Sequence, residues 1–199
     1  MNVPILFSKR LEDWLNNKHI KTLADLLIIS SEKSFAVCIL VLMIIPALPL
    51  PTGGITHIFE IISILLGIEM ILGRKVIWLP KRWLNIDLSG IGKNKIIISS
   101  LRKLKWIEKH SKKRLETILA NDYFLRITGF LFLLFCFAAF IAPPFSGLDT
   151  LPSLAAVLIA LSLIFEDVIL YIIGLIIGLI GIGTIFVLGG AILNSFKLI

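Results

Sequence analysis

Cysteine and histidine are scarce in this chain, whose 199 residues contain two cysteines and three histidines. Cys38 and Cys136 lie inside apolar segments, and neither belongs to a CxxC pair or has a histidine nearby. A disulfide framework and a zinc site are therefore not expected. A Ser–His–Asp set, a phosphate-binding glycine loop and a nucleotide fingerprint are also missing, so we expect no catalytic activity, no cofactor and no bound metal ion.

Charged residues are few as well. They make up 17% of the chain, against 57% apolar residues, and the mean hydropathy is +0.97. A soluble domain carries about 25% charged residues. Several apolar runs are also longer than a core helix requires. The composition therefore excludes an ordinary soluble domain and predicts an integral membrane protein.

The basic residues, which give a net charge of +7, are unevenly distributed. Of the 20 Lys and Arg residues, five lie in 1–33, fourteen in 74–126, and none in the loops 49–56 and 143–151. Because cytoplasmic loops are enriched in Lys and Arg, both basic segments are predicted to be cytoplasmic and both loops to face the other side. We expect a multi-pass protein of the bacterial cytoplasmic (inner) membrane and no nucleic-acid partner.

Two similar units lie 93 residues apart. This shift places Pro51 on Pro144 and Gly54 on Gly147. In each unit an apolar arm (34–48 or 127–142) precedes a break, and another arm (55–72 or 151–165) follows it. Proline and glycine interrupt helices, so the pattern predicts two copies of a helical hairpin. The breaking residues are Pro46, Pro49, Pro51, Gly53 and Gly54 in the first copy and Pro143, Pro144 and Gly147 in the second.

The arms leave two membrane placements open. As helices they would be about 23–27 Å long, slightly shorter than the roughly 30 Å hydrocarbon core. Each hairpin therefore either spans the bilayer with a turn at the far surface, or is re-entrant with its tip inside the membrane. Proline leaves carbonyls without helical partners, so we expect the two breaks to pack together, with Thr52, His57 and Asp149 supplying hydrogen bonds.

The remaining segments differ in charge. Lys93 to Arg114 holds nine basic residues and one acid. The helical period over 93–119 predicts an amphipathic helix on the anionic cytoplasmic leaflet, and Trp78, Trp83 and Trp106 suit the same interface. Residues 168–193 carry no charge and predict a transmembrane helix. Its glycines, Gly174, Gly178 and Gly181, favour close helix contact within the protomer or in a homodimer.

These features predict an all-α membrane protein with two repeated, proline-broken hydrophobic hairpins. The expected segments are an interfacial N-terminal segment (1–33), the first hairpin (34–73), a basic cytoplasmic amphipathic segment (74–125), the second hairpin (126–167) and a C-terminal transmembrane helix (168–199).

Four stretches carry a family resemblance. They are TLADLL (22–27), PALPLPTGG (46–54), GIEMILGRKVIWLPKRWL (67–84) and IAPPFSGLDTLPSLAAVLIALSLIFED (141–167). From about Thr22 to the end, the chain resembles the ExoD family of bacterial membrane proteins. That family usually has glutamine where this chain has Glu69. The resemblance implies a role in exopolysaccharide production and supplies no molecular activity.

Ionisable residues inside membrane segments are costly and mark candidate sites. His57 and Glu60 lie three residues apart, on one helix face near the first break, where they could relay a proton or hold a cation. The full candidate site is His57, Glu60, Glu69, Thr52 and Asp149. A further candidate is an ion pair between Arg74 and Asp167, which the 93-residue shift makes equivalent. Glu69 is an alternative partner for Arg74.

Two functions fit this sequence. The first is an accessory membrane component of exopolysaccharide or envelope-polysaccharide production, bound to anionic lipid and to polysaccharide-assembly proteins. The alternative is a small dimeric transporter, a proton- or ion-coupled carrier for a lipid-linked or envelope substrate, because transporters often place sites at broken helices where repeats meet.

Overall fold

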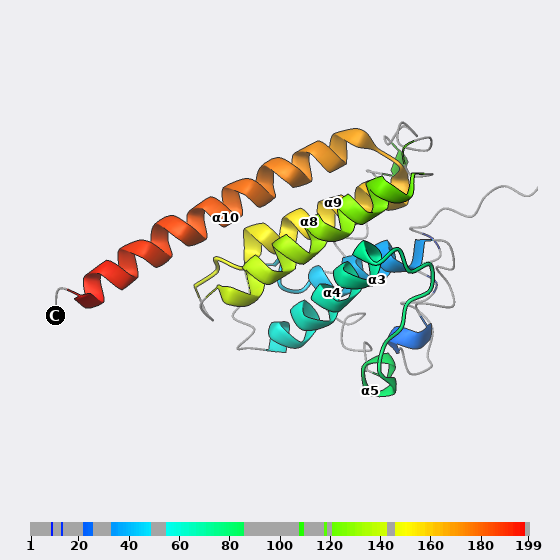
Figure 1. The fold of residues 1–199 in the computed structure, drawn as a ribbon, viewed down its shortest axis with the longest axis horizontal. Helices are drawn as coiled ribbons and strands as arrows, with labels where there is room; N and C mark the ends of the chain where they lie inside the picture. The colour runs from blue at the N-terminus through cyan, green and yellow to red at the C-terminus, as the bar shows by residue number, and fades with distance from the viewer. Residues whose placement is uncertain are drawn as a thin grey trace, which may run out of the picture.

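Every element in the described part of the chain is a helix, which confirms the expected all-α class (Figure 1). The computed structural model describes Lys9, Asp13, Ile118 and residues 22–25, 33–48, 55–85, 108–109, 121–142 and 146–197. Most of the predicted amphipathic helix over 93–119 and most of the N-terminal segment lie outside these residues. The break residues from Pro49 to Gly54, with Thr52 among them, and Pro143 and Pro144 lie outside them as well.

Four helices form a bundle, with α10 along its outside. The four bundle helices are α3 (Ser34–Met43), α4 (Ile55–Ile71), α8 (Asp122–Ile141) and α9 (Thr150–Phe165), and the outer helix is α10 (Val168–Lys197). The short α5 (Lys81–Leu84) follows α4. Helix α3 packs against α4 and α9, and α8 packs against the same two helices. Helix α10 lies mainly along α9 (Figure 1). Each predicted break therefore lies, in the sequence, between two helices that are neighbours in the bundle.

Glycine allows α4 and α8 to approach closely. A Cβ at Gly129 would lie 2.6 Å from the Cβ of Met70 and 2.9 Å from the carbonyl oxygen of Gly67. A Cβ at Gly67 would lie 2.9 Å from the backbone nitrogen of Leu133. Since real Cβ atoms do not approach other atoms so closely, both positions require glycine for this helix spacing.

The glycine stripe of α10 is used within the protomer. Gly174 faces the backbone of α9 at Ala155, Gly178 faces the ring of Phe135 in α8, and Gly181 faces Pro152 at the start of α9. Successive glycines of α10 contact progressively earlier residues of α9, so the two helices are antiparallel. Beyond Gly181, α10 continues past the end of the bundle (Figure 1).

Helices α4 and α9 end in the same way, with a left-handed residue. In α4 this residue is Gly73 (φ 73°), and the Arg74 N–H donates to the carbonyl of Glu69 at 3.0 Å. In α9 it is Glu166 (φ 58°), and the Asp167 N–H donates to the carbonyl of Ser162 at 3.0 Å. Such caps satisfy the last carbonyls of a helix.

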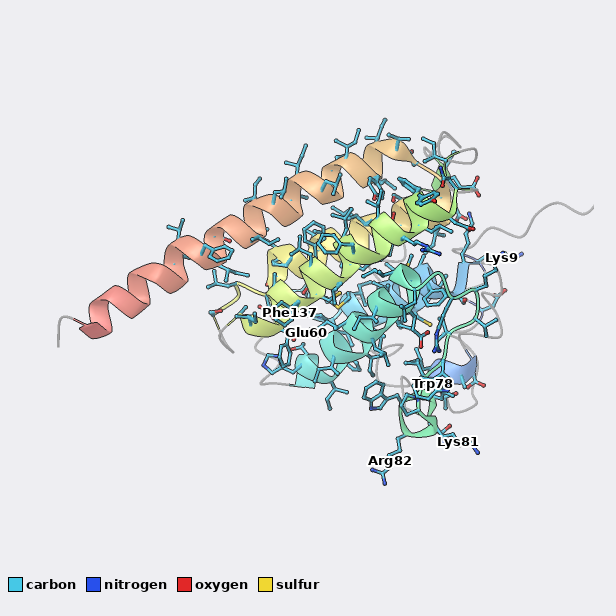
Figure 2. The ribbon with its side chains drawn as sticks, viewed as in Figure 1. Lys9, Glu60, Trp78, Lys81, Arg82 and Phe137 are labelled. Carbon is cyan, nitrogen blue, oxygen red and sulfur yellow. The ribbon has the colours of Figure 1, made fainter. Side chains whose placement is uncertain are left out.

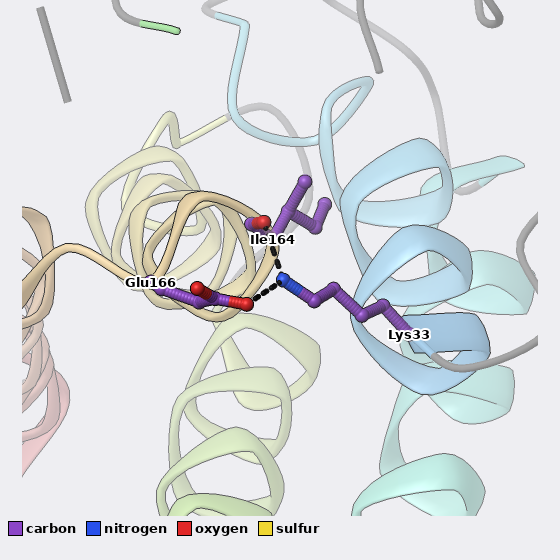
Figure 3. A network of polar contacts seen from close by, with 3 residues as sticks. All are labelled: Lys33, Ile164 and Glu166. Carbon is purple, nitrogen blue, oxygen red and sulfur yellow. Dashed lines mark hydrogen bonds and ion pairs between the residues drawn. The ribbon is translucent and has the colours of Figure 1, made fainter. Parts of the chain in front are cut away.

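A lysine before α3 closes the bundle at the end of α9. Lys33 Nζ donates to the carbonyl of Ile164 at 2.8 Å and pairs with Glu166 Oε1 at 2.7 Å (Figure 3). A cation is favoured at a helix C-terminus because the last carbonyls carry partial negative charge. This contact links the first hairpin to the second.

The helix boundaries follow local chemistry. Helix α3 ends at Met43, before the expected arm end at 48, because Pro46 has no N–H to continue the helical hydrogen bonds. Helix α8 begins at Asp122, inside the segment expected to be cytoplasmic, because the Asn121 side chain accepts a hydrogen bond from the Tyr123 N–H at 2.9 Å.

Among the described residues, two helices are long and apolar enough to cross a membrane: Asp122–Ile141, and Val168–Leu188 within α10. Only 33% and 22% of their most apolar windows are buried in the fold, whereas a core helix of a soluble protein is mostly buried. Large apolar side chains are exposed on both, including Phe130, Ile176 and Leu179. A bilayer would cover such surfaces.

Candidate functional site

The candidate site is centred on a buried carboxylate in α4. Glu60 is fully buried, and its Oε2 lies 2.7 Å from His57 Nδ1. The two residues are neighbours on α4 because residues three apart share a helix face. The imidazole also packs edge-on against Phe140 of α8, with ring centroids 5.4 Å apart. Figure 2 shows Glu60 far from Trp78, towards the other end of α4.

The second hairpin contributes Asp149, directly before α9. Its carboxylate interacts electrostatically with both His57 and Glu60. Burial raises the pKa of Asp149, and backbone hydrogen bonds and the charge of His57 oppose that rise. The structure therefore brings together three of the five predicted site residues, from the break ends of both hairpins. We call His57, Glu60 and Asp149 the tip cluster.

Two serines extend this polar region and were missed by sequence reasoning. Ser63 lies one turn beyond Glu60, and Ser153 lies one turn beyond Asp149. Both hydroxyls and Glu60 Oε1 are buried and have no hydrogen-bond partner in the described part of the chain. Buried polar atoms are nearly always hydrogen-bonded, so three such atoms need an explanation. One sequence feature could have pointed to Ser153: the 93-residue shift aligns it with Glu60.

Glu69 belongs to the opposite end of α4. It is nine residues, or about 14 Å, from Glu60 along the helix. Its Oε2 accepts a hydrogen bond from the Trp78 N–H at 2.9 Å, and its Oε1 lies 3.6 Å from Arg74 Nη1. A straight helix does not bring residues five apart together; the left-handed turn at Gly73 folds Arg74 back towards Glu69.

Arg74 therefore pairs with Glu69 rather than with Asp167. The Asp167 side chain accepts a hydrogen bond from the Ile169 N–H at 2.9 Å, at the start of α10. A carboxylate at a helix N-terminus satisfies a free N–H and complements the helix dipole. The two turns are alike, but their surroundings differ. Helix α10 begins directly after Asp167, whereas Arg74 lies near the acid Glu69, whose equivalent under the 93-residue shift is Ser162.

The tip cluster contains a pair that can hold a proton. His57 Nδ1 and a Glu60 carboxylate oxygen lie 2.7 Å apart, close enough to share one proton, and the Asp149 carboxylate interacts electrostatically with both residues. Within the described residues, no three His, Cys, Asp or Glu side chains are arranged to hold a metal ion. The chemistry that the His57–Glu60 pair supports is thus proton exchange, and the binding of a cation stays a prediction.

The described helices include two that are long, apolar and largely exposed, as in an all-helical membrane protein. A model of the family described as "Exopolysaccharide synthesis, ExoD" matches residues 7–187. The chain belongs to the ExoD family, as the sequence resemblance implied. It is 26% identical over 145 residues to the uncharacterized protein slr1875 of Synechocystis sp., covering 73% of this chain and 68% of that protein. No solved structure matches the chain.

Proposed function

We propose that the chain contains two copies of one hairpin, related by a two-fold axis along the membrane normal. The contacts at the ends of α4 and α9 support this. Lys33 lies at the left-handed cap of α9, and its equivalent Arg126 lies at the left-handed cap of α4. The caps themselves, Gly73 and Glu166, are also 93 residues apart.

Small residues support the same relation. Gly67 and Gly129 bring α4 and α8 together, and their equivalents under the shift are Ala160 and Ala36. These alanines are buried in α9 and α3, which also pack against each other. One helix contact thus corresponds to the other, as a two-fold axis requires.

We also propose that the protein is a multi-pass component of the bacterial cytoplasmic membrane, with both breaks on the side opposite the basic segments. The apolar arms and the Lys and Arg distribution support this topology. Inside the membrane it acts as an accessory component of exopolysaccharide production, next to the proteins that assemble the polymer. Its membership in the ExoD family supports that role.

Activity in this role depends on the tip cluster. The observation that carries this proposal is the fully buried Glu60, which is paired with His57 and interacts electrostatically with Asp149 of the other hairpin. A carboxylate kept inside a membrane bundle lowers stability. Apolar side chains in place of His57 and Glu60 would pack there without this loss of stability. The presence of the acid therefore favours a functional role for it.

The role is tested by deleting the gene in the bacterium that encodes it and measuring secreted polysaccharide. We expect a loss that the wild-type gene restores, with the restored protein in the membrane fraction. Unchanged secretion, in conditions where the wild-type protein is present in the membrane, would contradict the role.

A second candidate function is an ion-coupled carrier for a lipid-linked or envelope substrate. The tip cluster favours this function, because the cluster combines polar groups from both hairpins near the breaks between their helices. Two hairpins and one further helix are few for a carrier, so this function includes a homodimer. The apolar outer face of α10, with Ile176, Leu179 and Ile180 exposed, is available for that contact.

A further inference from the structure

Residues 72–85, which follow α4 and include the short helix α5, form a connection that is both apolar and cationic at its surface. Leu72, Val76 and Trp78 are 63%, 79% and 61% exposed. The same connection contains no Asp or Glu. Its basic side chains, all exposed, are Arg74, Lys75, Lys81 and Arg82. Figure 2 shows Trp78, Lys81 and Arg82 on this part of the molecule.

The backbone of the connection is fixed to the bundle. The Trp78 N–H donates to the buried carboxylate of Glu69, and the next residue, Leu79, is 6% exposed and part of the core. The turn at Gly73 is held by hydrogen bonds to α4. The exposed side chains are therefore presented on an ordered backbone, so their exposure needs a reason other than a loose loop.

Arg126 adds a cation to this surface. Its Nη2 lies 3.0 Å from the position of a Cβ on Gly73, so the guanidinium lies on the turn. Among the described residues, Arg126 has no acid within ion-pair distance. Lys33, its equivalent in the proposed repeat, pairs with Glu166. At the α9 cap, the cation Lys33 is thus neutralised by Glu166. At the α4 cap, Arg126 adds positive charge beside exposed apolar side chains.

We propose that the Gly73 turn binds an anionic phospholipid of the cytoplasmic leaflet. The phosphate lies at the turn, where Arg126 and Arg74 supply guanidinium groups that match phosphate oxygens in geometry and charge. The acyl chains lie on Leu72 and Val76, and Trp78 lies at the boundary between headgroup and chain. A soluble phosphate would need the cations and would leave these apolar side chains exposed; a phospholipid needs both. This site rests on the membrane placement proposed above.

Fluorescence quenching by brominated lipids tests the site. The full chain, with Trp14, Trp83 and Trp106 replaced by phenylalanine, is placed in nanodiscs of neutral phosphatidylcholine with a minor fraction of anionic phosphatidylglycerol. Either lipid carries bromine in separate samples. We expect brominated phosphatidylglycerol to quench Trp78 more than its share of the bilayer predicts. Arg126→Gln should reduce that enrichment about five-fold, the value of one basic residue near an anionic surface.

Three further results separate the explanations. Lys9→Gln, which removes one exposed charge outside residues 72–85, should leave the enrichment unchanged, and Arg126→Lys should retain part of it. Equal quenching by both lipids in proportion to their content would overturn the specific site while leaving the membrane placement intact. Trp78 unquenched by either lipid would contradict both. Melting curves in the same nanodiscs establish that the variants are folded.

Discussion

Replacing Gly129 with alanine is expected to destabilise the bundle by about 3 kcal/mol, the upper part of the range for overpacked cores. The new methyl group would lie 2.6 Å from the Cβ of Met70 and 2.9 Å from backbone atoms of Gly67 and Ile71. Backbone cannot rotate away as a side chain can, so α4 and α8 must separate. Thermal unfolding of the purified protein in a fixed detergent measures the effect.

Gly183 is the matched control for that variant. It lies in α10, and nothing is within 4 Å of a Cβ at this position. Alanine is the better helix former, so Gly183→Ala is expected to leave the melting temperature unchanged or to raise it slightly. If Gly129→Ala is as stable as Gly183→Ala, the close packing of α4 against α8 is wrong.

Replacing Glu60 with glutamine is expected to reduce secreted polysaccharide to the level of the deletion strain. The amide has the same shape as the carboxyl group but cannot exchange a proton, nor does it bring a negative charge to His57. Glu60→Asp, which keeps a carboxylate, should restore part of the activity. Secreted polysaccharide is measured against the amount of each variant in the membrane fraction.

Asp122→Asn is the control for the loss of one carboxylate, because Asp122 is exposed at the start of α8. It should restore secretion fully. Full restoration by Glu60→Gln, at wild-type protein levels, would show that the tip cluster is only structural. In reconstituted vesicles, loss of proton movement in Glu60→Gln would support the carrier over the accessory role.

Much of the helix pattern could be predicted from the sequence because its signals are local. Pro46 ends α3, Gly73 ends α4, and uncharged apolar runs make up most of α8 and of α10. The 93-residue shift also placed Asp149 and His57 at equivalent ends of two hairpins, close to one another in the structure. Local chemistry and the predicted repeat were enough for these features.

Contacts that depend on a turn or on another helix could not be predicted. The pairing of Arg74 with Glu69 needs the left-handed turn, and the pairing of Lys33 with Glu166 joins residues 133 apart in the sequence. Ser153 was missed because its alignment with Glu60 does not reveal that its hydroxyl is buried without a hydrogen-bond partner among the described residues. Glu69 was grouped with Glu60 since both are acids on α4, yet they lie at opposite ends.

The central claim is that two hairpins enter the membrane from the same side, with their breaks facing the other. Single cysteines at Ser146 and Lys75, both exposed, test it in a background lacking Cys38 and Cys136. We predict that a membrane-impermeant thiol reagent labels Ser146→Cys on intact spheroplasts and labels Lys75→Cys only after lysis. Labelling of Lys75→Cys on intact spheroplasts, or equal protection of the two positions, would contradict the account.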